Sequence, residues 1–193
     1  ETAWPVLRFK DRYEIGVGDW MRVEVYAPAV GTYYLYGVSA STRTNWEEQG
    51  IDLSMFKGQA NVQIVFRLAS NNDGVTGDGW FVDEVRVEEH VPEVLSYPYY
   101  DRFEKGLTNW VSASWGVTTN GVYAETNAAL DAVSGIRIAP DAWYVMNLGG
   151  ELNLTGAVSP RVTYWERGTH AGAYPYTHHR FQVSVDGGRG WTD

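Results

Sequence analysis

Short stretches in which apolar and polar residues alternate recur along the chain and predict β-strands. Residues 21–26, MRVEVY, alternate strictly, and in residues 62–68, VQIVFRL, every second side chain from Val62 to Leu68 is apolar. Because successive side chains of a strand point to opposite faces of a sheet, this period indicates strands that are buried on one face only. Turns rich in glycine and asparagine, such as SNNDGVTGDG at 70–79, separate the stretches. We therefore expect an all-β protein.

Residues 77–90, GDGWFVDEVRVEEH, place a carboxylate inside such a pattern. Counting by twos puts Asp83 on the same face as Val85 and Val87. A carboxylate on a buried face is costly unless a charge or hydrogen bonds compensate it. We therefore expect Asp83 to face inward and to have a partner, which is a bound metal ion, a set of backbone amides at the end of the sandwich, or an arginine such as Arg67.

Composition supports the β assignment and narrows the function. The 193 residues include 9 Trp, 13 Tyr and 21 Gly, a profile typical of aromatic strands joined by glycine turns. The net charge of −9 disfavours nucleic acid and anionic membrane surfaces, which proteins bind with Lys and Arg. No apolar stretch approaches the roughly 18 residues of a membrane helix, so we expect no membrane insertion. The absence of cysteine excludes disulfides and thiol catalysis.

The chain contains an internal repeat. PVLRFKDR at 5–12 matches PRVTYWER at 160–167, with a proline at the start and an acidic residue followed by arginine at the end. MRVEV at 21–25 matches HRFQV at 179–183, so the two copies are offset by 155 to 158 residues. With such a period, we expect the 193 residues to begin and end inside repeats.

This offset divides the chain into two incomplete units. We expect residues 1–90 to be the C-terminal part of one β-sandwich repeat, residues 91–97 to be a linker, and residues 98–193 to be the N-terminal part of the next repeat. Half a sandwich leaves unpaired strand edges and an apolar face. The halves must therefore pair with each other, or be completed by other copies of the chain or by adjacent repeats.

Motifs from both copies resemble one family. YYDRFEKGLTNWVSASWGVTT at 99–119, the hairpin VSVDGGRGW at 183–191 and GDGWFVDEV at 77–85 are similar to the MAM-like jelly-roll domains of secreted bacterial proteins, which include regions that follow immune-inhibitor-A-type metalloproteases. The resemblance spans nearly the whole chain in permuted order. It implies a jelly-roll-like antiparallel β-sandwich in tandem repeat, secreted or held at the cell surface.

The resemblance also implies a structural calcium ion. Carboxylates near the ends of such domains often serve calcium, and the matching residues here are Asp83 of WFVDEV and Glu104 of RFEKG. Calcium takes six to eight oxygen ligands, so backbone carbonyls or Asp78 would have to join them. Glu84 stands where the family frequently has a second aspartate. Because Asp83 and Glu104 belong to different repeats, the sequence does not decide whether this chain contains one complete calcium site.

The sequence lacks the motifs of common enzyme classes, namely a nucleophile elbow, a zinc-binding helix and a phosphate loop. We therefore expect a non-enzymatic structural or adhesive repeat of an exported cell-surface or filament-forming protein, completed by neighbouring segments. The alternative is a carbohydrate-binding accessory domain of a secreted hydrolase or metalloprotease with a polysaccharide as partner, because exposed aromatic rings stack on sugars. The candidate ligand-binding residues for this alternative are Trp46, Trp80, Trp110, Tyr99 and Tyr100.

Overall fold

The computed structural model of the chain is almost entirely made of β-strands, and this confirms the expected fold class. The residues that the structure describes are 4–112, 115–120, 122–131, 146–167, 181–186 and 190–193. Within them the helical content is one 3-10 turn, η1 (Ser54–Phe56), and no helix there is long and apolar enough to cross a membrane.

The structure contains twelve strands among the described residues. They are β1 (Trp4–Glu14), β2 (Trp20–Ala27), β3 (Gly31–Ser39), β4 (Thr42–Asp52), β5 (Gln63–Ala69), β6 (Gly79–His90), β7 (Glu93–Leu95), β8 (Trp110–Ser112), β9 (Trp115–Thr118), β10 (Ala128–Asp131), β11 (Met146–Leu148) and β12 (Gly150–Leu152). The predicted strands at 21–26 and 62–68 are β2 and β5.

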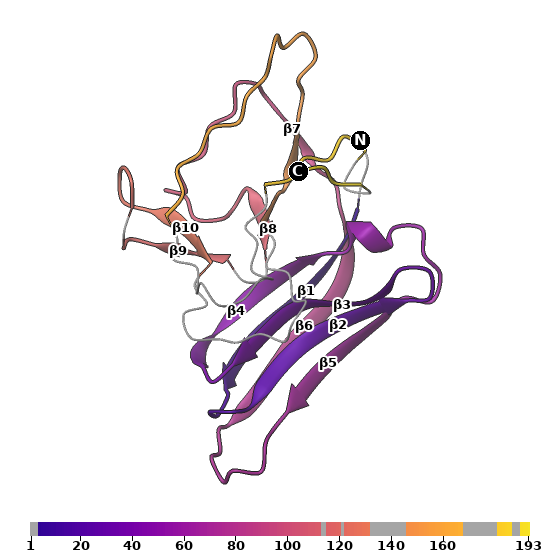
Figure 1. The fold of residues 1–193 in the computed structure, drawn as a ribbon, viewed down its shortest axis with the longest axis vertical. Coiled ribbons are helices and arrows are strands. Elements are labelled where there is room, and N and C mark those ends of the chain that lie inside the picture. The colour runs from indigo at the N-terminus through magenta and orange to yellow at the C-terminus, as the bar shows by residue number, and fades with distance from the viewer. Residues whose placement is uncertain (1–3, 113–114, 121, 132–145, 168–180, 187–189) are drawn as a thin grey trace.

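Two antiparallel sheets of three strands face each other and form a sandwich (Figure 1). One has the order β4-β1-β6 and the other the order β3-β2-β5. The alternation in the central strands builds the core, because Leu7 and Phe9 of β1 and Val23 and Val25 of β2 are completely buried. The Phe9 ring meets Phe66 edge-on at 5.2 Å. Full burial of each such side chain contributes roughly 1.5–3 kcal/mol.

A β-bulge in β6 changes the alternation, so the prediction that Asp83 faces inward is wrong. The pairing of β6 with β1 shifts register after Asp83, and Glu84 within the shift has a φ of 50°. Before the bulge, Trp80 and Val82 pack against the core, while Asp83 is exposed. After it, Val87 pairs with a fully buried residue of β1. Asp83 and Val87 therefore lie on different faces.

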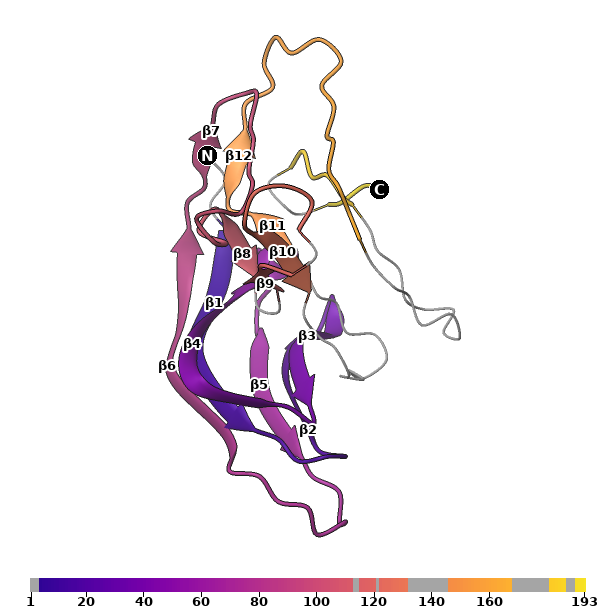
Figure 2. The same ribbon diagram turned by 90° about the vertical axis from the view of Figure 1, so that its left-hand side faces the viewer.

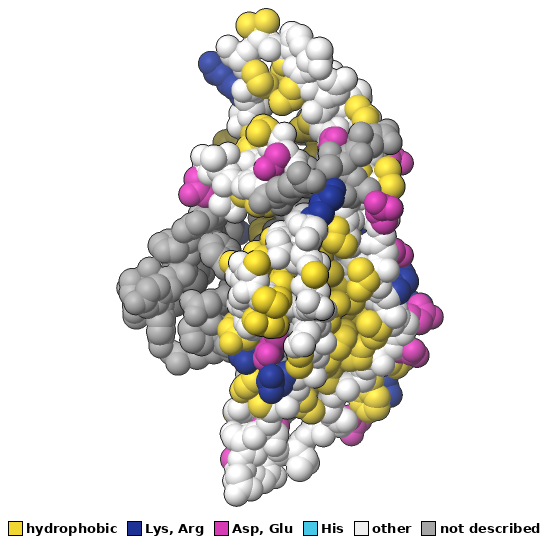
Figure 3. All heavy atoms as spheres, turned by 90° about the vertical axis from the view of Figure 1, so that its right-hand side faces the viewer, with side chains coloured by type: hydrophobic (Ala, Val, Ile, Leu, Met, Phe, Trp, Pro, Cys, Tyr) yellow, Lys and Arg dark blue, Asp and Glu magenta, His cyan; other side chains and the backbone are white. Residues whose placement is uncertain are grey.

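On the side where β5 faces β6, the sandwich is closed at Phe66 and Trp80, whose ring centroids lie 5.4 Å apart, but apolar side chains of the inner faces are exposed toward the two ends of this side. Leu68 of β5 and Val87 of β6 pair with the buried residues Met21 and Leu7 and therefore lie on the inner faces of their sheets. Their exposed fractions are nevertheless 49% and 55%. Hydrophobic side chains gather over the sandwich on this side of the molecule (Figure 3). We name this feature, defined by Leu68 and Val87, the open edge.

The residues after β6 form short strand pairs beyond one end of the sandwich (Figure 2). β8 pairs with β11 and β9 with β10, both antiparallel, whereas β7 and β12 are parallel. Residues 160–167, the second copy of the β1 sequence, are described without strand structure and are exposed. In the other matched segment, residues 179–180 lie outside the described residues. The division into two incomplete repeats stays a prediction.

Candidate functional site

A completely buried carboxylate lies at the centre of the sandwich. Asp11 is on the inner face of β1, and its exposed fraction is zero. Its two oxygens accept hydrogen bonds from side chains of three strands. The donors are Tyr36 Oη (2.8 Å), Arg43 Nη1 (2.8 Å), Gln49 Nε2 (3.1 Å) and Trp80 Nε1 (3.1 Å). We call these five residues the Asp11 cluster.

The Asp11 cluster satisfies a charge that burial would otherwise make very unfavourable. The Arg43 guanidinium supplies the opposite charge, and three neutral donors complete the coordination of the carboxylate. Burial, followed by the negative charge of Asp11, raises the pKa of Tyr36 well above its usual range, so Tyr36 remains a hydrogen-bond donor. Burial alone would lower the pKa of Arg43, but the neighbouring acidic groups outweigh it and raise this pKa. Tyr36 therefore keeps its proton and Arg43 its charge at ordinary pH.

A second carboxylate organises the start of the following half. Asp101 accepts hydrogen bonds from Tyr99 Oη (3.0 Å), Phe103 N (2.8 Å), Asn109 Nδ2 (3.3 Å) and Trp110 Nε1 (3.0 Å). Burial would raise the pKa of Asp101, but these hydrogen bonds outweigh it and lower the pKa. Partial burial, with the hydrogen bond to Asp101, raises the pKa of Tyr99 to about 12. Asp101 thus stabilises the conformation of residues 99–110 through these hydrogen bonds.

An apolar contact joins the two halves of the chain. Val111 of β8 packs with Trp4 and Val6 of β1, and all three side chains are buried. The Trp4 ring also contacts the His90 ring, with 4.7 Å between the centroids. Val6 lies on the outer face of its sheet, opposite to the core, so the second half covers this end of the outer face. We call this region the junction.

Polar contacts border the junction. Asn147 of β11 donates a hydrogen bond to Asp52 at the end of β4, and His90 hydrogen-bonds to the carbonyl of Gly149. Burial raises the pKa of Asp52, and hydrogen bonds from Ser54 and Asn147 offset this only in part. The junction therefore contains a carboxylate that folding disfavours in its charged form.

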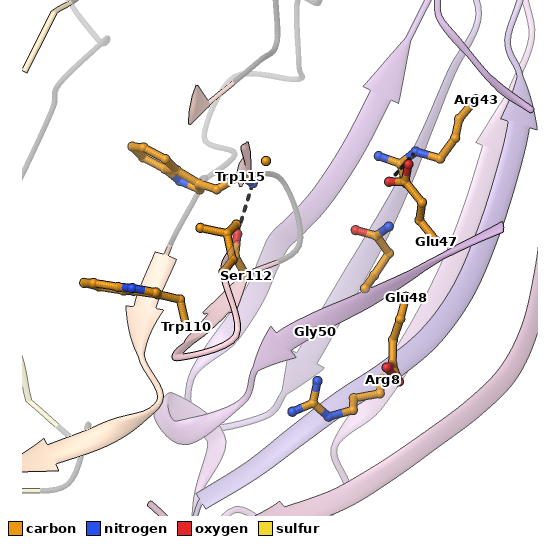
Figure 4. Close-up of a pocket in the computed structure, with 11 residues that line it drawn as sticks. Arg8, Arg43, Glu47, Glu48, Gly50, Trp110, Ser112 and Trp115 are labelled. Atoms are coloured by element: carbon orange, nitrogen blue, oxygen red, sulfur yellow. Dashed lines mark hydrogen bonds and ion pairs between the residues drawn. The ribbon is translucent and has the colours of Figure 1, made fainter. Parts of the chain in front are cut away.

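A cavity of about 320 Å³ lies between the sandwich and the strands of the second half. Arg43, Glu47 and Glu48 approach it from β4, while Trp110 and Trp115 belong to the opposite wall (Figure 4). Both indole rings extend away from Arg43 and Glu47 in this view. The cavity is therefore bordered on the β4 side by charged groups, and Arg43 connects it to the Asp11 cluster.

An aromatic row crosses the outer face of the β4-β1-β6 sheet. The Arg12 guanidinium of β1 lies over the Phe81 ring of β6 at 4.1 Å and over the Trp46 ring of β4 at 5.5 Å. The exposed fractions of Phe81 and Trp46 are 38% and 46%. We call these three residues the Arg12 row, in which a cation lies over two partly exposed aromatic rings.

The residues predicted to hold calcium have separate partners in the structure. Asp83 accepts a hydrogen bond from the backbone N–H of Glu84 (2.7 Å). Glu104 accepts backbone N–H bonds from Thr126 (3.0 Å) and Asn127 (2.9 Å). The described residues contain no group of three or more His, Asp or Glu that could hold a metal ion. Calcium binding stays a prediction.

Asp78, the third candidate calcium ligand, and Arg67, the candidate ion-pair partner, do not contact Asp83 in any interaction of the described residues. Asp78 is exposed, five residues before Asp83, which is roughly 16 Å along a strand. Arg67, a candidate partner of Asp83, instead binds Glu24 through its Nε (2.6 Å) and Nη2 (3.1 Å) atoms. Lys10 is the residue that pairs with Asp83 in the sheet.

The five residues predicted to bind sugar do not form one surface. Trp80 is a member of the Asp11 cluster, and Trp110 and Tyr99 are hydrogen-bonded to Asp101. Tyr100 is 73% exposed and lies under the Arg102 guanidinium at 4.7 Å. Trp46 belongs to the Arg12 row. Of the five, Trp46 and Tyr100 therefore present a ring to solvent.

Sequence reasoning did not identify Asp11 as a site residue, although the signal was present. The acid followed by arginine in the repeated motif is Asp11 in one copy and Glu166 in the other. Alternation also places Asp11 between the apolar residues Phe9 and Tyr13. The same reasoning that was applied to Asp83 therefore applies to Asp11, because the register shift between Asp11 and Tyr13 places its extra residues on β4 and leaves the alternation along β1 unchanged.

Comparison with known proteins gives a short similarity. A stretch of 49 residues, 25% of this chain, is 39% identical to Bacillopeptidase F of Bacillus subtilis (strain 168) and covers 3% of that protein. No protein-family model and no solved structure matches the chain. The chain thus spans a small fraction of this relative, and the similarity concerns only part of the chain.

Removing the Asp11 carboxylate should destabilise the sandwich strongly. We expect Asp11→Ala to lower the free energy of unfolding by about 3 kcal/mol or more, because Arg43 and three further donors lose their acceptor inside the core. Denaturant unfolding followed by tryptophan fluorescence measures this loss. Asp83→Ala, a change of the same residue type on the exposed face, should stay within about 0.5 kcal/mol. A loss below 1 kcal/mol for Asp11→Ala would contradict the assigned role.

The buried Asp52 should make stability depend on pH with an unusual sign. Because its pKa in the folded protein lies above the ordinary 3.8, its favourable contribution is present below pH 3.8 and is lost as the pH rises through the folded pKa. The stability of Asp52→Asn relative to the parent should therefore increase between pH 3 and neutral pH, as measured by urea unfolding.

Asp73→Asn is the control, because its effect on stability should depend on pH in the opposite direction. Hydrogen bonds from the Val75 backbone and from Asn71 lower the pKa of Asp73. Its contribution is therefore present above pH 3.8 and is lost on acidification, so the relative stability of Asp73→Asn should decrease over the same range. Equal pH dependence of the two variants would refute the assignment.

Proposed function

We propose that the chain is a non-enzymatic structural or adhesive β-sandwich module of the MAM-like kind, part of an exported protein, in which neighbouring segments complete each sandwich. The resemblance to MAM-like domains of secreted bacterial proteins supports export. The partial similarity to a bacterial peptidase supports a second element of the proposal, in which such modules accompany an enzyme in a longer polypeptide.

The open edge is the observation that carries this proposal. Leu68 and Val87 lie on inner faces and yet are about half exposed. Burying these apolar side chains would stabilise the protein, because apolar surface would be removed from water. The unpaired backbone N–H and C=O groups of an edge strand can also bind a further strand. A segment that covers this edge therefore gains both apolar burial and strand pairing.

The junction supports serial packing of modules. Val111 buries Trp4 and Val6 on the outer face of the sandwich, and the hydrogen bond between Asn147 and Asp52 adds a directional contact. A contact that combines a buried apolar centre with polar neighbours holds two units in one relative orientation. Repetition of this contact along a polypeptide produces a stiff array, which suits a structural or adhesive part.

Association through the open edge tests the proposal. We expect the chain to self-associate at micromolar concentration, because the edge has no covering segment among the described residues. The double variant Leu68→Lys/Val87→Lys should weaken association by roughly tenfold or more, since it places charges in an apolar contact. Sedimentation velocity measures the effect.

The control for this experiment is a valine outside the edge. Val17→Lys changes a residue that is 69% exposed in the loop between β1 and β2, and should leave association unchanged. A parent chain that is monomeric at all concentrations and binds no apolar dye would count against the open edge as a contact surface.

Carbohydrate binding is the second candidate function, and the Arg12 row favours it. Trp46 and Phe81 are partly exposed aromatic residues on a sheet face, and the Arg12 guanidinium lies over both rings. Ring faces stack on the apolar face of a pyranose, and a guanidinium donates hydrogen bonds to its hydroxyls. The charged wall of the cavity lies next to the same sheet face and offers further polar groups.

Affinity electrophoresis in gels containing a soluble polysaccharide tests the second candidate. If the Arg12 row binds sugar, the polysaccharide should retard Trp46→Ala less than the parent chain. The apparent affinity derived from this retardation should fall by roughly tenfold. Trp20→Ala is the matched control, because Trp20 lies beside Arg22 at 4.4 Å on the other sheet. A parent chain that migrates equally in gels with and without a panel of polysaccharides would eliminate this function.

A further inference from the structure

Residues 160–167 repeat the pattern of the central strand of the sandwich. Val162, Tyr164 and Glu166 alternate with polar or aromatic residues, as strand residues of one face do. In the repeat they occupy the positions of three residues of β1 that are completely buried, which are Leu7, Phe9 and Asp11. The second copy thus has the residues of an inner strand, including the acid.

In the structure this segment lacks the surroundings of its counterpart. Residues 160–167 are exposed, with Tyr164 at 60% and Trp165 at 75%. The Trp165 ring stacks on Tyr123 at 4.1 Å, and the Tyr164 ring stacks on Phe181 at 5.7 Å. These contacts cover each ring in part, whereas β1 lies between β4 and β6 and under the opposite sheet.

We propose that residues 160–167 form the central strand of a second sheet when the same polypeptide supplies a segment with the pattern of residues 42–90, and that Glu166 then occupies the position of Asp11. This inference rests on the proposed completion of each sandwich by neighbouring segments and names the partner. The partner is recognised by an arginine at the position of Arg43, with further donors at the positions of Gln49 and Trp80.

Charge and topology select this partner over others. A carboxylate enters a core only with a cation and hydrogen-bond donors. In the first copy β4 supplies the cation, Arg43, and one donor, Gln49, while β6 supplies another, Trp80. In the first copy β1, β4 and β6 all belong to one continuous stretch of sequence, residues 4–90, so the partner strands of the second copy are expected from a segment of the same polypeptide.

A fusion of the intact chain tests the inference. Position 193 corresponds to position 35 at the offset of 158 residues, so a second copy of residues 36–95 is joined directly after Asp193. We expect the amides of residues 160–167 to gain at least roughly 100-fold in hydrogen-exchange protection.

Variants of the fusion separate the role of Glu166 from general folding. Glu166→Ala, and replacement of the appended copy of Arg43 by Met, should each reduce the gained protection by roughly 100-fold. Thr163→Ala, on the opposite face of the segment, should leave it within about threefold. The first sandwich unfolds in the same sample and serves as an internal reference. Equal effects of Glu166→Ala and Thr163→Ala would overturn the placement of Glu166.

Two further outcomes would overturn the inference as a whole. If residues 160–167 exchange equally fast in the fusion and in the 193-residue chain, the proposed partner segment is wrong. In that case, a new cooperative unfolding transition of the appended segment would still support the proposed function. If no such transition is seen either, both the inference and the proposed function are refuted. If the 193-residue chain alone protects these residues at high concentration, the occupant is a second copy rather than a segment of the same polypeptide.

Discussion

The need of a buried carboxylate for a complete set of donors organises this sandwich. Asp11 lies on the inner face of β1 with no exposure, and its four donors come from strands of both sheets. Tyr36 belongs to one sheet and the other donors to the other sheet, so the cluster fixes how the two sheets face each other. Apolar contacts favour many arrangements of two sheets, whereas this set of hydrogen bonds is satisfied in one.

Some inner-face residues of the sandwich are buried and others are exposed to water, and the proposed function depends on this difference. The core is complete around Phe9 and the Asp11 cluster, whereas the inner faces near Leu68 and Val87 meet water. At the opposite outer face, the junction already covers Val6 with residues of the second half. A module with one covered face and one open edge is suited to addition in series, and the proposed structural role depends on this asymmetry.

Much of the fold was predictable from local pattern, but one face assignment was not. The strands at 21–26 and 62–68 follow from alternation, and the repeated acid and arginine marked Asp11 without revealing its role. The assignment of Asp83 to the inner face was wrong because Glu84 adopts a left-handed conformation within a bulge and shifts the register. Periodicity assumes an unbroken strand, so a single extra residue reverses its conclusion.

The sequence by itself determined that the chain is β-structured and that an acid followed by arginine recurs in a second copy. These properties are local, because they depend on residue type and spacing along one strand. The tertiary structure decided which acid is buried, which donors reach it, and which tryptophans are structural. Those outcomes depend on strands distant in sequence: Arg43, Gln49 and Trp80 converge on Asp11 only through sheet order and register, which residue spacing does not encode.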